Sequence, residues 1–332
     1  MLLLSEDDIR RLLSMDDLIE AMQGALVEYS HGRVRQPLRT VLDVETPAGA
    51  GANGHAFFGV MPAHIPKSGA LGTKLVTVFA SNAAIGLPSH LATIVLLDQT
   101  TGELLAVMDG RFITEARTAA VSAVSARLLA RADASTMAIL GSGVQARSHL
   151  AAITRVRAIA RIRVWSPSGA RRRAFVEDMR STTTASLAEV ASAEAAVRGA
   201  AIVVLATASR EPVVRSEWVD DGAHIAAVGA CRPDQREMDP ALVARARTFV
   251  DSRTGALAEA GDIVLAIRDG RIDASHIAGE LGELAAGSVP GRRDAREVTL
   301  FKSLGMAVED VAAAHLAYVR ATERGLGRGV PL

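Results

Sequence analysis

The residues of this chain that are most clearly arranged for chemistry form a turn with two glycines. Residues 138–150, AILGSGVQARSHL, run from an apolar segment through Gly141, Ser142 and Gly143 into a helical pattern. This is the G-x-G-x-x-A pattern, ending at Ala146, in the strand-to-helix context that it requires. The first glycine permits a tight turn, and the second lets a pyrophosphate approach the backbone and the unpaired N–H groups of the helix. We therefore expect NAD(H) or NADP(H) to bind at Gly141, Ser142, Gly143, Val144 and Gln145.

The end of the next predicted strand bears on the choice between these two cofactors. An acidic residue there would bind the ribose 2′-hydroxyl of NAD, but the chain reads VWSPSGARRR, with Ser166 at that position. Ser166, Ser168 and Arg171 could instead receive the 2′-phosphate of NADP, although the three arginines equally fit a solvated helix face. The sequence thus slightly favours NADP(H). Thr207 and Gly229 end two further predicted strands, at the edge where parallel sheets bind ligands, and are also expected to contact the cofactor.

Lysine is rare in this chain. Of 37 basic residues only Lys67, Lys74 and Lys302 are lysines. A lysine retained among so many arginines can mark a place where a compact ammonium must be desolvated and its pKa lowered. Lys67 lies among turn-forming residues and is expected at the surface. Lys74 and Lys302 lie in the apolar segments LGTKLVTVF and VTLFKSLGMA, which makes them candidates for chemistry.

The first part of the chain must position Lys74. Its first thirty residues predict a helix. The β-rich runs that follow are separated by Gly, Pro, Asn and Asp, and they predict an antiparallel sheet of hairpins over residues 40–46, 55–61, 70–79, 90–98 and 102–109. A helix with a face of small residues is predicted over 113–130, with Thr114 as its cap.

The glycine turn begins a different rhythm, in which strands and helices alternate. Apolar strands alternating with helices predict a parallel sheet covered on both faces. The predicted strands are 136–140, 161–165, 200–207, 223–229 and 247–252, and helices include 145–156 and 169–180. A last helix over 305–325 is expected to return to the first domain. The fold class is therefore α/β: a Rossmann-type doubly wound parallel sheet, residues 117–304, inserted in a discontinuous α+β substrate-binding and dimerisation domain, residues 1–116 plus 305–332.

Composition excludes several classes of partner. The chain has 332 residues, 49% of them apolar, a formal net charge of zero and no long run of one charge, which favours a small ligand over nucleic acid or membrane. No apolar run is long enough to span a bilayer. With Cys231 as its single cysteine the chain can form no internal disulfide, so a cytoplasmic location is expected. The eight histidines show no HExxH pattern, and we expect no catalytic metal.

Many ordered segments resemble the ornithine cyclodeaminase and mu-crystallin family, and within it the ketimine-reductase branch. The resemblance is carried by QPLRTVL, GTKLVTVF, LPSHLATIVLLD, ITEARTAAVSAVSA, ILGSGVQARSH, DGAHIAAVGACRPDQRE and TLFKSLGMAVED. It implies a homodimer in which the N-terminal sheet domain makes the dimer contact and one wall of the active site, with a Rossmann domain as the other wall. It also implies a small amino acid or imine as substrate, its carboxylate held by Arg39, Lys74 and Arg117.

Elementary chemistry agrees with these roles. An arginine fork binds a carboxylate bidentately, and a buried Lys74 with a lowered pKa could donate a proton to the substrate nitrogen. For Arg39 and Arg117 a structural salt bridge is the alternative interpretation. Arg117 and Thr118 are also candidates for contact with cofactor phosphate.

One departure from the family concerns the reaction. Its cyclodeaminases carry an aspartate in the loop after the fifth Rossmann strand, and alignment on Pro233 places Cys231 there. Without that carboxylate a cyclising deamination is disfavoured, and reduction of a C=N bond is favoured. Cys231 would then lie at the substrate, more as a small loop residue than as a nucleophile.

Further site residues complete the hypothesis. His90 is assigned to the nicotinamide or to a proton relay, with a structural role as the alternative; Glu259 is assigned to the substrate, and Lys302 and Ser303 to the nicotinamide side. The predicted function is NAD(P)H-dependent reduction of a small imino acid, a cyclic ketimine or an acyclic imine such as iminosuccinate, to an L-amino acid, reversible as an amino-acid dehydrogenase. The alternatives are an ornithine or lysine cyclodeaminase with tightly bound NAD and a non-catalytic small-ligand-binding protein.

Overall fold

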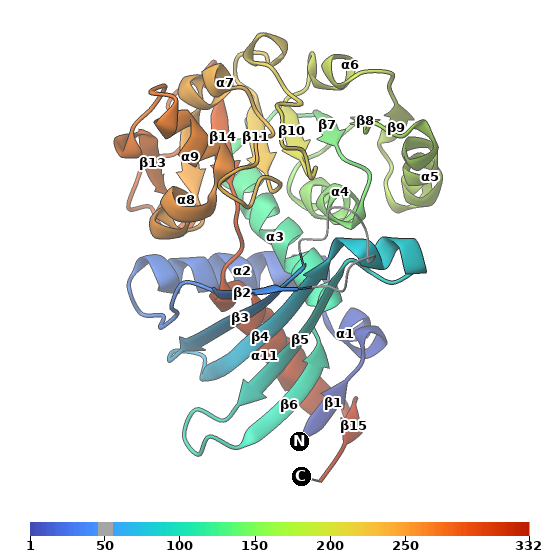
Figure 1. The fold of residues 1–332 in the computed structure, drawn as a ribbon, viewed down its shortest axis with the longest axis vertical. Coiled ribbons are helices and arrows are strands. Elements are labelled where there is room, and N and C mark those ends of the chain that lie inside the picture. The colour runs from blue at the N-terminus through green and yellow to red at the C-terminus, as the bar shows by residue number, and fades with distance from the viewer. Residues whose placement is uncertain (46–55, 332) are drawn as a thin grey trace. The chain divides into compact units, whose positions relative to one another are not determined.

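Two β-sheets organise the chain, one in each of two units (Figure 1). The computed structural model describes residues 1–45 and 56–331. Contacts within the chain divide it into unit 1, Met1–Arg117 with Met306–Leu332, and unit 2, Thr118–Gly305. These boundaries differ by one residue from those expected from the sequence. Thr46 and His55, at the ends of two predicted strands, lie outside the described residues.

Unit 1 contains a seven-stranded sheet in the order β15-β1-β6-β5-β4-β3-β2. Strands β2 to β6 pair antiparallel, as expected for hairpins, whereas β1 pairs parallel with β6. Residues along β3 and β4 alternate between buried and partly exposed, the pattern of a sheet with one covered face. The strands are β1 Leu2–Leu4, β2 Thr40–Val44, β3 Ala56–Ile65, β4 Ala70–Phe79, β5 His90–Leu97, β6 Leu104–Asp109 and β15 Arg328–Gly329.

The helices of unit 1 correct one expectation. The first thirty residues do not form a single helix: β1 is followed by α1 Glu6–Leu12 and α2 Met15–Ser30. The break occurs because Leu13 is extended and the Ser14 side chain accepts a hydrogen bond from the backbone N–H of Asp17, which starts a new helix. The 3-10 helix η1 Ala80–Ile85 follows β4, and α11 Ala307–Arg324 packs against α2 and against β3, β4 and β5.

The long helix α3, Arg111–Leu129, contains the boundary between the two units. Thr114 does not cap it, contrary to expectation. The helix begins three residues earlier, at Arg111, whose backbone N–H donates a hydrogen bond to the Asp109 carboxylate at 2.9 Å. Thr114 sits inside the first turn, where its hydroxyl donates to the carbonyl oxygen of Gly110 at 2.8 Å.

Unit 2 is a doubly wound α/β domain. All strand pairs of its sheet are parallel, in the order β13-β12-β14-β11-β10-β7-β8-β9. The strands are β7 Thr136–Leu140, β8 Arg161–Trp165, β9 Ser186–Glu189, β10 Ile202–Leu205, β11 His224–Ala227, β12 Arg247–Val250, β13 Ile277–Glu280 and β14 Thr299–Lys302. The α-helices that lie wholly in unit 2 are α4 Val144–Val156, α5 Gly169–Met179, α6 Ala193–Val197, α7 Pro240–Arg245, α8 Arg253–Glu259, α9 Gly261–Arg268 and α10 Leu281–Ala285. The 3-10 helices of unit 2 are η2 Arg180–Thr182, η3 Ser216–Trp218 and η4 Ala274–His276.

Both faces of this sheet are buried. Along β10, Val203 and Leu205 belong to one apolar cluster, and Ile202 and Val204 belong to another. The order of strands reverses at β7: β8 and β9 follow on one side of it, and β10, β11 and β14 lie on the other. In open parallel sheets, ligands bind at the carboxyl ends of the strands at such a switch point.

Candidate functional site

The turn after β7 lies at this switch point. Gly141 has a φ of 119°, a conformation that favours glycine. A Cβ atom on Gly141 would lie 2.3 Å from the carbonyl oxygen of Ala206, just after β10. Glycine is therefore required here for both conformation and space, and the turn is packed directly against the end of the neighbouring strand.

The next glycine faces open space. Gly143 is the N-cap of α4 and makes no side-chain capping hydrogen bond, and a Cβ there would meet no atom within 4 Å. Ala146 is fully buried, and the Gln145 side-chain oxygen is buried with no hydrogen-bond partner among the described residues. The start of a thirteen-residue helix with uncapped N–H groups and space in front of it fits the pyrophosphate of a dinucleotide. Val144 is exposed at the same turn.

The residues assigned to the cofactor ribose lie beside this turn. Ser142 donates a hydrogen bond to the hydroxyl of buried Ser166 at 3.0 Å. Ser168 caps α5 and accepts a hydrogen bond from the N–H of Arg171, whose side chain is exposed. One interpretation of the three arginines was a solvated helix face, but Arg172 is half-buried. Its guanidinium donates a hydrogen bond to the carbonyl oxygen of Ser166 at 2.5 Å. The structure thus brings Ser142, Ser166 and Arg172 together.

The carboxyl ends of β10, β11 and β14 also meet. A Cβ on Gly229 would lie 2.2 Å from the carbonyl oxygen of Thr207. Lys302, at the end of β14, is fully buried, and its ammonium donates to the carbonyl oxygen of Gly229 and lies 3.5 Å from the Asp262 carboxylate. Ser303 is also buried, 3.4 Å from the carboxylate of Asp251.

Three more residues of unit 2 were predicted to contact the substrate or the cofactor, and they come from three different segments. Cys231 is half-buried in the loop after β11, and its thiol donates to the Val228 carbonyl at 3.1 Å. Glu259 is the last residue of α8 and is half-buried, and Thr118 is buried in α3.

In unit 1, the structure brings Lys74 and Arg117 onto one carboxylate. Lys74, on β4, is only 2% exposed, and its ammonium lies 2.5 Å from the Asp310 carboxylate on α11. The other oxygen of Asp310 accepts a hydrogen bond from the Arg117 guanidinium at 2.8 Å. Arg117 also forms an ion pair with Glu309 at 2.5 Å. These buried pairs compensate one another's desolvation.

The environment of Lys74 lowers its pKa. Burial lowers the pKa of Lys74 to about 8; the Asp310 carboxylate opposes this, and the positive charges of Arg117 and Arg39 add to it. Asp310 keeps its pKa below the usual range, because the attraction of Arg117 and Lys74 outweighs the opposing effect of burial. Lys74 can thus lose or accept a proton near neutral pH, while Asp310 stays ionised.

Arg39 and His90 belong to the same region of unit 1. Arg39 is half-buried just before β2. His90, the first residue of β5, has its pKa lowered to about 4, first by burial and then by the charge on Lys74, so it is neutral at pH 7. Arg39 lies close enough to Lys74 for its positive charge to contribute to the lowered pKa of that lysine.

Sequence reasoning missed the acidic partners. Glu309 and Asp310 lie in the segment TLFKSLGMAVED, but were given no role. A signal was present: three and four residues after Asp310 come Ala313 and Ala314, then Ala317, which share one buried face of α11. An acidic pair at the start of an otherwise apolar stripe indicates buried cations as partners.

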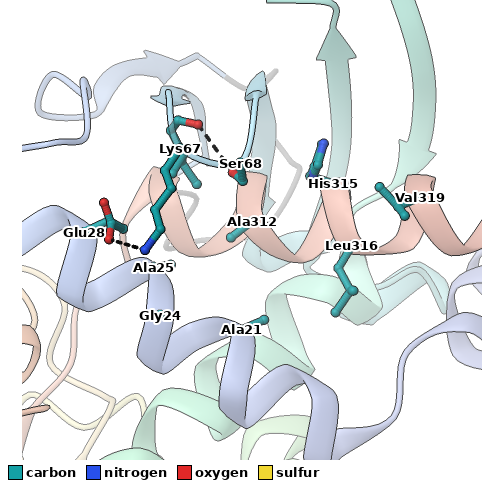
Figure 2. Close-up of a pocket in the computed structure, with 11 residues that line it drawn as sticks. Ala21, Gly24, Ala25, Glu28, Lys67, Ser68, Ala312, His315, Leu316 and Val319 are labelled. Carbon is teal, nitrogen blue, oxygen red and sulfur yellow. Dashed lines mark hydrogen bonds and ion pairs between the residues drawn. The ribbon is translucent and has the colours of Figure 1, made fainter.

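Lys67 differs from the other two lysines. Its side chain is 72% exposed, and it forms an ion pair with Glu28 at 3.0 Å, as expected for a surface residue. It lies at a pocket of about 410 Å³ whose other lining residues come from α2, α11 and the β3–β4 turn (Figure 2). Lys67 therefore serves as a matched control for Lys74.

In the described part of the chain, no group of three or more His, Cys, Asp or Glu side chains is placed to hold a metal ion. Among the helices of residues 1–45 and 56–331, none has the length and apolarity needed to cross a membrane.

Comparison with known proteins adds to this geometry. Residues 1–325 match the sequence profile described as the ornithine cyclodeaminase/mu-crystallin family. Ketimine reductase mu-crystallin from Mus musculus is 42% identical over 319 residues, covering 95% of this chain and 96% of the relative.

Two solved structures are similar over their whole length. A Thermococcus litoralis Delta(1)-pyrroline-2-carboxylate reductase in complex with NADH and L-proline has a TM-score of 0.95 and 41% identity, with 99% of this chain and 100% of that chain covered. An archaeal alanine dehydrogenase dimer with bound NAD has a TM-score of 0.92 and 32% identity, with 100% and 99% covered.

Proposed function

Because this chain belongs to the ornithine cyclodeaminase/mu-crystallin family, we propose that it uses NADH or NADPH to reduce the C=N bond of a small imino acid to an L-amino acid. The observation that carries the proposal is Lys74, a buried lysine with a pKa of about 8 held between Asp310 and two arginines. Similar proteins are a ketimine reductase and a pyrroline-2-carboxylate reductase.

In this proposal, unit 1 supplies the residues that bind the substrate. Arg39, Lys74 and Arg117 bind the substrate carboxylate, since Lys74 and Arg117 meet at Asp310 and the charge of Arg39 acts on Lys74. A carboxylate in a buried site needs paired positive charge of this kind, and the substrate is a cyclic ketimine or an acyclic imine such as iminosuccinate.

Lys74 also supplies the proton. The nicotinamide supplies a hydride to the imine carbon, and the nitrogen must then carry a proton. Lys74 has a pKa close to the working pH, which suits a general acid, and Asp310 holds its ammonium in place. His90 is neutral at pH 7, so we assign it a hydrogen-bonding role rather than a charge.

Unit 2 holds the cofactor in this proposal. Its assigned contacts are Thr118, Gly141, Ser142, Gly143, Val144, Gln145, Ser166, Ser168, Arg171, Thr207, Gly229, Lys302 and Ser303, together with His90 and Arg117 of unit 1. Cys231 and Glu259 are assigned to the substrate. The open N-terminus of α4 supports the pyrophosphate position, and Ser166 in place of an acidic residue supports a slight preference for NADP(H).

The identity of one residue, Cys231, favours a reductase over a cyclodeaminase. Cys231 occupies the position at which the family's cyclodeaminases have an aspartate, and its thiol donates a hydrogen bond to the Val228 carbonyl oxygen. A thiol in that position supplies no carboxylate for the amino group of ornithine. A non-catalytic binding protein would have no need of both a desolvated lysine and a complete glycine-turn motif in one chain.

We also propose a homodimer and a cytoplasmic location. β2 is an edge strand of its sheet, and Leu38, Val41 and Leu42 on and before it are about half exposed. An exposed apolar edge of this kind is stabilised by pairing with a second copy. A similar alanine dehydrogenase is a dimer. The single cysteine agrees with a reducing compartment.

The test follows oxidation of NADH and NADPH by absorbance with cyclic imines, with 2-oxo acids plus ammonia, and with ornithine and lysine. Imine-dependent oxidation that is lost in Lys74→Ala and kept in the control Lys67→Ala is expected. Ammonia release from ornithine without net NADH formation would establish the cyclodeaminase instead. Neither cofactor oxidation nor ammonia release with any of these compounds would favour a binding protein.

A further inference from the structure

Three charged side chains form a buried cluster in unit 2, and two of them have no role in the proposed function. Glu237, Asp262 and Lys302 are each fully buried. They come from the loop that follows β11, from α9 and from β14, respectively. Burying charged groups is costly unless they are paired and hydrogen-bonded, so the contacts of this cluster indicate its purpose.

Glu237 contacts the ends of two strands. One carboxylate oxygen accepts hydrogen bonds from both the backbone N–H and the hydroxyl of Thr207, each at 2.7 Å. The carboxyl group also packs against Gly229, where a Cβ atom would lie 2.4 Å from it. Only glycine at this position leaves room for the Glu237 side chain.

The other two members hold Glu237 and Gly229 in place. Asp262 accepts hydrogen bonds from the backbone N–H groups of Glu237 and Met238 at 2.8 and 3.0 Å. Its second oxygen lies 3.5 Å from the ammonium of Lys302, which donates to the carbonyl of Gly229. The contacts therefore form a closed ring that joins the ends of β10, β11 and β14.

The charged neighbours of Glu237 and its burial together set its protonation state. Burial raises the pKa of Glu237 to about 7; the Lys302 ammonium opposes this, and the Asp262 carboxylate adds to it. Lys302 and Asp262 balance each other, so the cluster is neutral when Glu237 carries a proton. The half-buried Cys231 thiol is the remaining titratable group that acts on Lys302.

We propose that Glu237 is a positioning residue for the nicotinamide half of the cofactor: through Thr207 and Gly229 it fixes the strand ends that receive that half. The inference rests on the proposed function, since it assumes a dinucleotide at the switch point. In doubly wound folds each half of the sheet receives one mononucleotide, with the pyrophosphate at the glycine turn between them. β10, β11 and β14 lie on the side of β7 away from Ser166, so they form the nicotinamide half.

The test compares two ligands that share the adenosine and pyrophosphate but differ in the nicotinamide. Calorimetric titration measures Kd for NADH and for ADP-ribose, or for NADPH and 2′-phospho-ADP-ribose if the wild type prefers them. We expect Glu237→Ala to weaken reduced-cofactor binding by about tenfold or more and to change ADP-ribose binding by less than about threefold. Glu237→Gln keeps an oxygen acceptor for Thr207 and is expected to restore the affinity to within about threefold of wild type.

The remaining outcomes are equally distinct. An equal loss for both ligands in Glu237→Ala, or no loss for either, would overturn the inference. Failure of the wild type to bind either ligand would overturn the proposed function itself. If Glu237→Ala does not fold, Glu237→Asp keeps the carboxylate but withdraws it from Thr207 by one methylene, and its selective loss of reduced-cofactor affinity decides the question in the same way. The exposed Glu217, changed to Gln, is the control and should leave both affinities unchanged.

Discussion

At the residue scale, the function of Lys74 depends on the balance of charges around it. Burial and two arginines favour the neutral amine, while Asp310 favours the ammonium, and the result is a pKa of about 8. An arginine at this position would stay charged at every working pH and could anchor a carboxylate without donating a proton. This difference explains why a chain so poor in lysine has one here.

A pH profile tests this role. In the proposed role of general acid Lys74 acts only when protonated, and its pKa is lowered to about 8, so kcat/KM should be constant below that pH and fall about tenfold per unit above it. Asp310→Asn removes the charge that raises the pKa of Lys74, so the fall should begin at lower pH. Lys74→Arg should lose most activity and show no such fall. If kcat/KM of Asp310→Asn begins to fall at the same pH as in the wild type, Lys74 is not the general acid.

The sequence allowed some site residues to be predicted and not others. Gly141, Gly143 and Lys74 were predictable because glycine spacing and an apolar neighbourhood are local signals. Glu309 and Asp310 were not, because their partner Arg117 lies more than 190 residues away. The apolar stripe of α11 signals that this helix start is covered, but a carboxylate early in a helix normally indicates a favourable interaction with the helix dipole, and only the tertiary fold identifies Arg117 and Lys74 as the partners of the pair.

At the element scale, the two glycines of the turn have different structural requirements. Gly141 needs a positive φ and has a neighbouring carbonyl where a Cβ would be. Gly143 has an ordinary φ of −85° and open space in front of it. The first is thus required by the fold, and the second by whatever occupies the space.

Alanine substitutions separate these requirements. Gly141→Ala should lower the free energy of unfolding by about 1–3 kcal/mol through strain and collision with Ala206, measured by chemical denaturation. Gly143→Ala should leave that free energy within about 0.5 kcal/mol of wild type. It should nevertheless weaken NAD(P)H binding by about tenfold, because the methyl group occupies the approach of the pyrophosphate. Unchanged cofactor affinity in Gly143→Ala would place the dinucleotide elsewhere.

Elements with strong periodicity were predictable, and short or capped ones were not. The apolar strands β7, β8, β10, β11 and β12 match their predicted segments closely. The edge strands β9 and β13 have four residues each with polar members, so they carry little period-two signal. The first thirty residues keep helical spacing across a break that only the Ser14 cap defines.

At the scale of the whole molecule, the exposed edge of the unit 1 sheet is the surface assigned to the proposed homodimer. β2 is exposed along almost its whole length, with two large apolar residues on it. An isolated apolar edge strand favours association with other chains unless it is covered. The proposed homodimer covers it symmetrically, as closed two-fold assemblies do.

Leu42→Asp tests that assembly. A charge on this exposed residue of β2 should shift the mass in solution from twice 34.8 kDa towards a monomer, measured by size-exclusion chromatography with light scattering. Leu257→Asp, an exposed leucine on α8 in unit 2, is the matched control and should leave the dimer intact. A Leu42→Asp protein that stays dimeric would place the interface on another surface.

The central claim, hydride transfer to an imine carbon, is tested most directly by isotope transfer. The enzyme is supplied with NADH or NADPH carrying deuterium at both C4 positions and with pyrroline-2-carboxylate, and the product is analysed by mass spectrometry. The account predicts L-proline with one deuterium on its α-carbon, formed by wild type and Lys67→Ala and not by Lys74→Ala. Proline without deuterium, or no product beside ammonia release from ornithine, would contradict it.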